Sequence, residues 1–454
     1  MTSGLTPCHY RVFRTRVRLP EGDADAMKVF VIGSGGREHA IAWALARSAG
    51  VREIVAAPGN GGLAEIARCV RADVGDPGEL ADVAETEGVA LTFVGPELPL
   101  VLGVADEFSR RGLKIIGPDA RAARLEGSKA FAKEFMARHG IPTARFTICD
   151  SAAEARRAIA SRRFDFPVVI KADGLAAGKG VSLAHTREEA EATIERLMVE
   201  RALGAAGERV VLEERLIGRE CSFLLFTDGE FIVPLPPAQD YKRAYDGDQG
   251  PNTGGMGAIS TPHLLDEATH ERILKEIAWP TVRAAAQDGF PYRGVLYIGL
   301  MLTPEGPRVL EYNVRLGDPE AQAILPRLES DLLEIGEALL AGELSRVRPR
   351  WREDSTVCLV LASGGYPGTY RTGHPIRGLE EVRRLPEVMI FHAGTTRAPD
   401  GSFLTAGGRV LNIVARGRTL AQARQRAYAA ASLIVFEQMH YRRDIGAEWT
   451  PTRA

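Results

Sequence analysis

Residues 28–32 are almost entirely apolar and lead directly into a glycine-rich turn, 33–36, and then into a helical pattern. Such a run is typical of a strand buried on both faces of a parallel sheet. Further strand-to-helix units follow at 91–97 and 114–118. The pattern predicts an open parallel α/β domain over 27–126, with its ligand crevice at the carboxyl ends of the strands.

The turn at 33–36 does not match the dinucleotide-binding fingerprint. That motif needs a third glycine where Glu38 stands, and the next strand ends at Pro58 without an acid for a ribose. A glycine loop that opens a helix still offers free N–H groups and a favourable dipole to an anion. Two interpretations remain: phosphate or substrate binding at Gly35 and Gly36, or a purely structural turn.

A second informative stretch is 309–320, where an apolar run ends in polar residues. Strand alternation places Glu311, Asn313 and Arg315 on one face and Tyr312 and Val314 on the other. A carboxylate and an amide oxygen suit Mg²⁺, which takes few protein ligands and completes its shell with phosphate and water. The arginine can hold an anion bidentately. The stretch indicates a nucleotide triphosphate and a second anion meeting over a metal, or alternatively an exposed strand face with an ion pair.

A lysine-tipped strand is predicted at 167–171, followed by a glycine-rich loop that carries Lys179. Lys171 and this loop together have the composition of a phosphate cradle, because glycines let backbone N–H groups approach and lysines supply charge. The loop is not a Walker A sequence, since only three residues separate Gly174 from Gly178 and Gly180 replaces Ser/Thr. An ordinary β-hairpin with a glycine turn is the alternative.

The stretch between the lysine strand and the acidic strand contains a predicted hinge and a long loop. A strand over 210–214 ends in two acids and is followed by Glu220, a pattern that fits an interdomain hinge for adenine and ribose or a solvated acid pair. Residues 239–257 are polar and glycine-rich, and we expect this loop to close over substrate. Loop position alone suggests substrate contacts at Asp240, Asn252 and Asp318.

Bulk composition limits the class of protein. The chain has 454 residues, so we expect two to four domains, and its 26% charged and 45% hydrophobic residues are ordinary for a soluble protein. A net charge of −2 gives no support to a nucleic-acid or membrane partner. The five cysteines form no C-x-x-C pair, which fits a reducing cytoplasm. We expect 1–26 to be a disordered extension whose deletion leaves stability and activity intact.

The last part of the chain, 350–446, reads as an α+β domain. Apolar strands are predicted at 357–361 and 388–392, and a helix over 420–439. No reactive constellation stands out in this part, and packing is the expected role of His392.

Five separate stretches together resemble one known family: 33–40, 171–181, 251–257, 311–320 and 439–446. They are similar to the glycinamide ribonucleotide synthetases, or phosphoribosylamine–glycine ligases, of the ATP-grasp superfamily. The resemblance implies an N-terminal α/β domain, a two-part ATP-grasp over 127–330 with a hinged part at about 143–216, and a C-terminal domain. It also implies that ATP, glycine and 5-phosphoribosylamine give glycinamide ribonucleotide, ADP and phosphate through a glycyl phosphate. We expect the protein to be a cytoplasmic monomer.

The resemblance also assigns roles to residues. It implies metal ligation of Mg²⁺, or Mn²⁺, by Glu311 and Asn313, and a catalytic role for Arg315 together with Lys171. The ATP contacts that it implies are Lys129, Lys171, Gly178, Lys179, Glu213, Leu216 and Glu220. Three positions depart from the family pattern: Tyr241 stands where His is usual, Leu316 where Phe is usual, and Gly299 where wider relatives carry a second metal acid.

Two competing interpretations stay open at the level of the sequence. One is another ATP-grasp ligase that uses a different acid and amine, which a substrate panel measuring ADP release would identify. The other is a nucleotide-binding or dinucleotide-binding regulator without turnover. The presence of Lys171, Glu311 and Arg315 argues against a protein without turnover, because phosphoryl transfer depends on positioning and charge neutralisation.

Overall fold

The computed structural model describes residues 26–161, 163–176 and 180–447. The predicted extension 1–26 lies outside this range except for its last residue. The first domain contains a five-stranded sheet in the order β3-β2-β1-β4-β5, and all of its pairings are parallel. Its elements are β1 (Met27–Gly33), α1 (Gly36–Leu45), β2 (Val51–Pro58), β3 (Arg68–Cys69), α2 (Pro77–Glu87), β4 (Leu91–Val94), α3 (Glu97–Val101), α4 (Val104–Arg110) and β5 (Ile115–Ile116).

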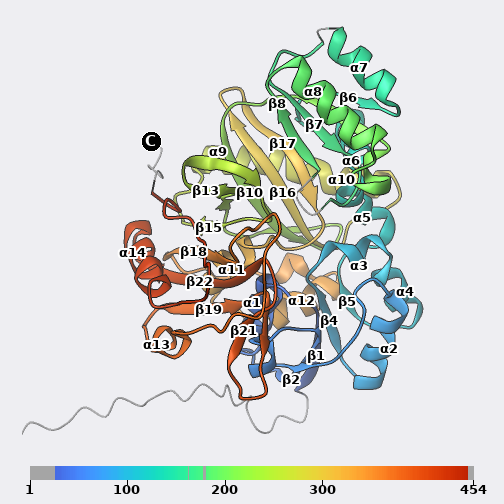
Figure 1. Cartoon of the computed structure of the whole chain (residues 1–454). Coiled ribbons are helices and arrows are strands. Elements are labelled where there is room, and N and C mark those ends of the chain that lie inside the picture. Colours follow the sequence, from blue (N-terminus) through green and yellow to red (C-terminus); the bar gives the residue numbers. More distant parts are fainter. Residues whose placement is uncertain (1–25, 162, 177–179, 448–454) are drawn as a thin grey trace, which may run out of the picture.

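The predicted open parallel sheet is therefore confirmed, and burial explains it. Residues 29–32 of β1 are fully buried, because β2 and β4 flank the strand and helices cover both faces of the sheet. The glycine turn at 33–36 ends β1 and begins α1 at the carboxyl edge of the sheet (Figure 1).

A separate small sheet carries the predicted lysine strand. It has the order β6-β9-β7-β8 and is antiparallel throughout. Its strands are β6 (Phe146–Cys149), β7 (Val168–Ala172), β8 (Val181–Ala184) and β9 (Val210–Glu214), and its helices are α7 (Ala152–Ala160) and α8 (Arg187–Ile194). This unit has its own apolar core and lies at the top right of Figure 1, next to the upper part of β17.

The largest sheet is antiparallel, with the order β17-β16-β10-β12-β15-β18-β22-β19 and β11 (Ile232–Pro234) paired to β10. Its first strands are β10 (Arg219–Thr227), β12 (Ala238–Asp240), β15 (Gly257–Ser260), β16 (Gly294–Thr303) and β17 (Gly306–Asn313). The C-terminal strands β18 (Ser355–Ala362), β22 (Arg409–Gly417) and β19 (Val388–His392) continue it, because β15 pairs with β18. One sheet therefore runs through the ATP-grasp part and the C-terminal part.

The C-terminal helix is shorter than predicted. The expected helix over 420–439 is wrong beyond Ala431, where α14 (Leu420–Ala431) ends. The chain then turns, and Val435 exchanges two backbone hydrogen bonds with Arg377, which removes those backbone groups from a helical ladder.

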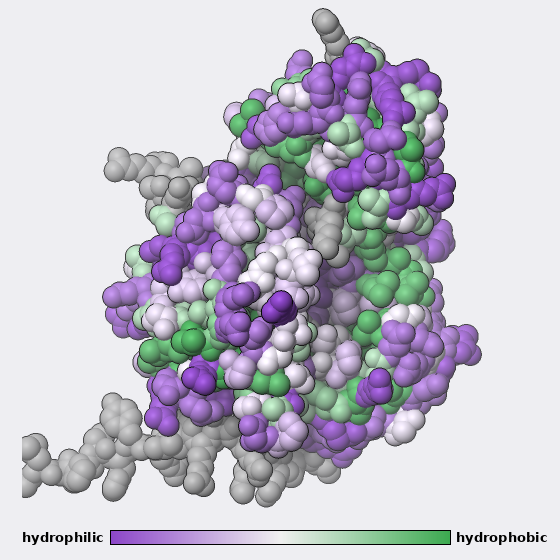
Figure 2. All heavy atoms as spheres, in the orientation of Figure 1, coloured by the Kyte–Doolittle hydropathy of each residue, from purple (hydrophilic) through white to green (hydrophobic). Residues whose placement is uncertain are grey.

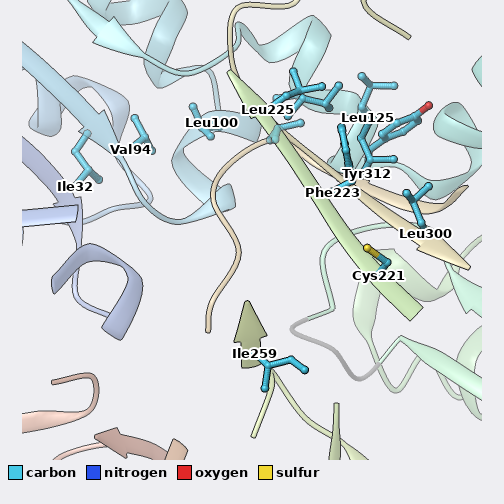
Figure 3. Close-up of a cluster of buried hydrophobic side chains, with 14 of the residues drawn as sticks. Ile32, Val94, Leu100, Leu125, Cys221, Phe223, Leu225, Ile259, Leu300 and Tyr312 are labelled. Atoms are coloured by element: carbon cyan, nitrogen blue, oxygen red, sulfur yellow. The ribbon is translucent and has the colours of Figure 1, made fainter. Parts of the chain in front are cut away.

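One apolar core joins the first domain to the large sheet. Ile32 and Val94 of the first domain belong to the same buried cluster as Phe223, Leu225 and Tyr312 of the large sheet (Figure 3). On the face drawn in Figure 2, apolar residues form separate patches among hydrophilic ones. No helix in the described part of the chain is both long and apolar enough to cross a membrane.

Candidate active site

The strand β17 presents its polar residues to one side, as predicted. Tyr312 is 2% exposed and Val314 1% exposed, so the odd-numbered residues face the opposite, accessible side. The Nη2 group of Arg315 donates to Asn313 Oδ1 at 3.0 Å, which confirms that these two side chains share that side. The alternation follows from the two-residue period of a strand with one buried face.

The lysine strand and the acidic strand meet at one place. Lys171 Nζ donates to the carbonyl of Leu310 at 2.9 Å, directly before Glu311. Lys129 Nζ donates to the carbonyl of Gly174 at 3.0 Å, at the start of the glycine loop. Burial raises the pKa of Glu311, but Lys242, Lys171 and Lys129 lower it to about 2. The charges of both sheets therefore act on the same carboxylate.

The helix α6 (Lys129–Arg138) is positioned by its N-terminal cap. Ser128 Oγ accepts from Phe131 N at 3.1 Å, and Asp173 Oδ1 accepts from Ser128 Oγ and Ala130 N at 2.9 and 3.0 Å. Because Asp173 follows β7, this cap ties the start of α6 to the lysine strand. The cap therefore fixes Lys129 beside the carboxyl end of β7.

Glu213 lies between two lysines rather than in solvent. Its Oε1 is 3.0 Å from Lys171 Nζ and its Oε2 is 2.9 Å from Lys133 Nζ, and the Glu213 side chain is only 2% exposed. Desolvation lowers the pKa of Lys133 to about 8, although Glu213 opposes this shift. The sequence reasoning missed Lys133, but its position four residues after Lys129 places both on one helix face.

Lys242 is a second cation that the sequence reasoning missed. Its Nζ lies 3.5 Å from Glu220 Oε2, 3.6 Å from Glu311 Oε1 and 4.0 Å from Asp240 Oδ2. Desolvation raises the pKa of Asp240 to about 8, although Lys242 opposes this shift. Desolvation lowers the pKa of Lys242, but the surrounding carboxylates outweigh it and raise that pKa well above the usual value.

Four acceptors hold the Arg315 guanidinium, and one of them is the Leu316 carbonyl, which accepts from Nη1 at 3.3 Å. Its Nε donates to Glu97 Oε2 at 3.2 Å, and its Nη2 donates to Glu126 Oε1 at 2.7 Å as well as to Asn313. Burial raises the pKa of Glu126 to about 7, although Arg315 opposes it and Val314 N donates to Glu126 Oε2 at 2.7 Å. Burial also raises the pKa of Glu97, but Arg315 lowers it to about 2. The guanidinium is therefore oriented before any ligand arrives.

The glycine turn of the first domain lies against the loop after β17. A Cβ atom added at Gly35 would lie 3.0 Å from Asp318 Oδ2. Asp318 is paired with Arg409 at 3.2 Å and accepts from Gln322 Nε2 at 2.7 Å. Burial raises the pKa of Asp318, but Arg409 lowers it below its usual range. At Gly36 an added Cβ would lie 2.6 Å from Gln322 Nε2, so close packing explains that glycine.

The remaining predicted residues have varied surroundings. Asn252 ends β14 (Gln249–Asn252) opposite Arg243 of β13 (Arg243–Tyr245) and is half-buried. Leu216 is half-buried in the linker between β9 and β10. Gly178 and Lys179 lie outside the described residues.

Two of the three departures from the family pattern are buried or tied to other parts of the chain. The Tyr241 hydroxyl accepts from Gly446 N at 3.0 Å, which joins the loop to the C-terminal segment. Leu316 is 4% exposed and its carbonyl accepts from Arg37 Nη1 at 3.0 Å. At Gly299 an added Cβ would lie 3.2 Å from Glu311 Cγ, so the Glu311 side chain packs closely over this glycine.

The donor set at the end of β17 fits a hard divalent cation. Glu311 supplies a carboxylate, and the Asn313 amide oxygen accepts only one hydrogen bond within the described residues, at 3.0 Å. The approach of the Lys242 ammonium to Glu311 shows that positive charge is stabilised at this position. A metal with few protein ligands takes the rest of its shell from phosphate and water.

A small lysine-bearing sheet facing the acidic edge of a larger antiparallel sheet defines an ATP-grasp protein. The chain is 48% identical over 421 residues to phosphoribosylamine–glycine ligase of Caldanaerobacter subterraneus, covering 93% of this chain and 100% of that relative. It is 49% identical over 424 residues to the enzyme of that name from Pseudomonas aeruginosa, covering 92% and 97%. The chain belongs to the phosphoribosylamine–glycine ligase family.

Domain-level and structural comparisons agree with this assignment. The family descriptions that match are phosphoribosylglycinamide synthetase N domain over 27–126, ATP-grasp (A) domain over 127–321 and C domain over 356–448. The crystal structure of phosphoribosylamine–glycine ligase from Thermotoga maritima aligns with a TM-score of 0.79 at 37% identity, covering 92% of this chain and 100% of that one. The biotin carboxylase domain of Hydrogenobacter thermophilus 2-oxoglutarate carboxylase shares the fold, with a TM-score of 0.69 at 18% identity over 91% of each chain. The predicted multidomain ATP-grasp architecture is confirmed.

Proposed function

We propose that this chain is an ATP-dependent ligase that joins glycine to 5-phosphoribosylamine and releases glycinamide ribonucleotide, ADP and phosphate, a step of purine biosynthesis. The supporting observation is that Lys129, Lys171 and Glu311 converge on one site in a chain 48% identical to a phosphoribosylamine–glycine ligase along nearly its whole length. Phosphoryl transfer requires such charge neutralisation and positioning and no covalent nucleophile.

The nucleotide would lie between the small and the large sheet. Lys129 and Lys171 would neutralise its phosphates, because Lys129 is anchored to Gly174 at the start of the glycine loop and Lys171, just before that loop, to Leu310 of β17. The linker after β9 would hold adenine, and Glu220 at the start of β10 would receive the ribose hydroxyls. The full set of proposed ATP contacts is Lys129, Lys171, Gly178, Lys179, Glu213, Leu216 and Glu220.

The metal would bind at the end of β17. Glu311 and Asn313 would hold Mg²⁺, with Mn²⁺ as an alternative. Glu311 is well suited because its pKa of about 2 keeps the carboxylate ionised at neutral pH. When bound, the metal supplies charge neutralisation on the transferring phosphoryl group.

The chain's own residues would then serve two successive transfers. A glycine carboxylate oxygen bonds to the γ-phosphorus while the bond to ADP breaks, which gives glycyl phosphate. The amine of 5-phosphoribosylamine attacks the acyl carbon, and phosphate leaves with the C–O electron pair as the nitrogen loses a proton. Arg315, already fixed by Glu97 and Glu126, would stabilise the negative charge of both stages.

Residues from four segments would bind the two acceptor substrates. The glycine turn and Asp318 lie together beside Arg409, which is suitable for a phosphorylated sugar. Gly36 would contribute through its backbone, because its Cα is packed against Gln322. The proposed substrate residues are Gly35, Gly36, Asp240, Asn252 and Asp318.

An isotope experiment tests the reaction directly. Glycine labelled with ¹⁸O in its carboxylate, incubated with ATP, 5-phosphoribosylamine and the enzyme, should deliver one ¹⁸O to the released phosphate. If the released phosphate contains no ¹⁸O, the reaction does not pass through a glycyl phosphate. A panel of other acids and amines tests for a different ligase, and no ADP release with any of them would favour a nucleotide-binding regulator.

We also propose that the protein works as a monomer in the cytoplasm, without a nucleic-acid or membrane partner. Its net charge of −2 supports the absence of a nucleic-acid or membrane partner, because nucleic-acid binding and anionic membranes favour basic surfaces. Light scattering during gel filtration, with and without substrates, tests the monomer.

A further inference from the structure

Lys242 is the cation closest to the Glu311 carboxylate in the described part of the chain, at 3.6 Å. It also approaches Glu220 and Asp240, so one ammonium faces acids from three strands of the large sheet: β10, β12 and β17. Its side chain is 34% exposed, so the group is not sealed into the core. This position places Lys242 in the cleft where nucleotide and metal would bind.

The backbone of Lys242 is held firmly although its side chain is accessible. Its carbonyl accepts from Thr253 N at 2.7 Å and from Thr253 Oγ1 at 2.9 Å. The preceding residue, Tyr241, donates from its N–H to Gly257 at 3.0 Å and accepts from Met256 N at 2.8 Å. Motion of the ammonium group therefore arises from side-chain torsions rather than from the loop.

The C-terminal segment clamps the same loop from outside. Arg442 is 1% exposed, its Nη1 contacts Asp248 Oδ1 at 2.7 Å, and its guanidinium lies 5.1 Å from the Tyr241 ring centre. Asp444 Oδ2 accepts from Gly247 N at 2.8 Å, and Arg443 N donates to Asp246 Oδ1 at 2.7 Å. These bonds hold residues 241–252, which include the β13–β14 hairpin, against the C-terminal segment and fix the position of the Lys242 backbone.

We propose that Lys242 is a further catalytic residue of the ligase: it neutralises Glu311 before nucleotide binds, then turns to the transferring phosphoryl group and the acyl phosphate. This inference rests on the proposed function. An ammonium and a divalent cation repel each other strongly when they share one carboxylate. The lysine must therefore move away from Glu311 when the metal binds there. The triphosphate oxygens that enter the site with the metal are the anions to which the ammonium would then turn.

Removal of the lysine should have opposite effects on metal binding and on turnover. Lys242→Met leaves Glu220 and Glu311 without their counter-ion, so nucleotide-free protein should bind Mn²⁺ about 10-fold more tightly. Its kcat should fall about 100-fold or more, the size expected when one preorganised cation is lost. Lys242→Arg keeps the charge and should retain the weak Mn²⁺ affinity of the unaltered protein. Lys275→Met, on an exposed helical surface, is the matched control and should change neither quantity.

The measurements are the titration of free Mn²⁺ by electron paramagnetic resonance without nucleotide, and product formation with ATP, glycine and 5-phosphoribosylamine. Circular dichroism and thermal unfolding establish that the variants are folded. Unchanged Mn²⁺ affinity in Lys242→Met, or unchanged kcat, would overturn the inference. Failure of the proposed function differs clearly from this, because the unaltered enzyme would then form no product.

Discussion

Glu213→Gln tests the buried charge arrangement behind the phosphate site. In the native protein Glu213 is the partner of both Lys133 and Lys171, and Lys133 is 2% exposed. The pKa of Lys133 falls from 10.5 to about 8 even with Glu213 present, which corresponds to about 3 kcal/mol against the charged form. Without the carboxylate that penalty grows, and we expect a loss of about 3 kcal/mol in the free energy of unfolding at pH 7, the lower end for breaking a buried pair.

The sign of the pH dependence follows from the lowered pKa. Unfolded Lys133 binds a proton up to pH 10.5 and folded Lys133 only up to about pH 8, so raising the pH through this window stabilises the folded protein. In the variant the folded pKa is lower still, so its deficit should shrink by about 1 kcal/mol between pH 7 and pH 9.

Urea unfolding at several pH values provides the measurement, and Glu214→Gln is the matched control. Glu214 pairs at 2.6 Å with Arg145, whose side chain is 66% exposed. An exposed pair of this kind contributes about 0–1 kcal/mol. If Glu213→Gln unfolds with the same free energy and the same pH dependence as the native protein, the argument from buried lysines is refuted.

Three further perturbations separate the roles of the site residues. Glu311→Gln should lower turnover by about 100-fold or more with the fold intact, because the carboxylate that we propose as a metal ligand is lost; an unchanged rate at limiting Mg²⁺ would refute this role. Arg315→Lys should be nearly as damaging as Arg315→Ala in kcat, because lysine cannot reproduce the fork that contacts Glu97 and Glu126; full activity of the lysine variant would remove Arg315 from the mechanism. Arg442→Leu should lower kcat about 10-fold while the ATP affinity measured by calorimetry stays within about 3-fold, because the change loosens the segment that carries Lys242 without touching nucleotide. An equal loss of kcat and ATP affinity would show instead that Arg442 supports only the stability of the fold.

Local periodicity was sufficient to predict the parts of the fold set by burial. The two-residue period at 311–315 correctly separated buried Tyr312 and Val314 from the polar face, because one side of β17 packs on the core. The first strand was recognised because 29–32 are buried on both faces and therefore apolar throughout. These signals come from residues adjacent in sequence, which a single chain displays without knowledge of its partners.

Long-range pairing was not predictable in this way. Residues 257–260 pair with 356–359 across about a hundred positions, and the backbone groups that make this join are the same in every residue type. The end of α14 at Ala431 was missed for a related reason. Val435 pairs with Arg377, and no local signal reveals that partner.

The two missed cations show how the site depends on sheet order. Lys133 could have been found from its spacing to Lys129, because residues four apart share a helix face. Lys242 could not, because its acids come from β10, β12 and β17, and only the order β17-β16-β10-β12 brings them together. Gly299 of the neighbouring strand β16 pairs with Glu311, and the Glu311 side chain packs directly over it, since an added Cβ would lie 3.2 Å from Glu311 Cγ. Position 299 therefore contributes no carboxylate beside Glu311, and the charged group that contacts Glu311 in the described part of the chain is the Lys242 ammonium.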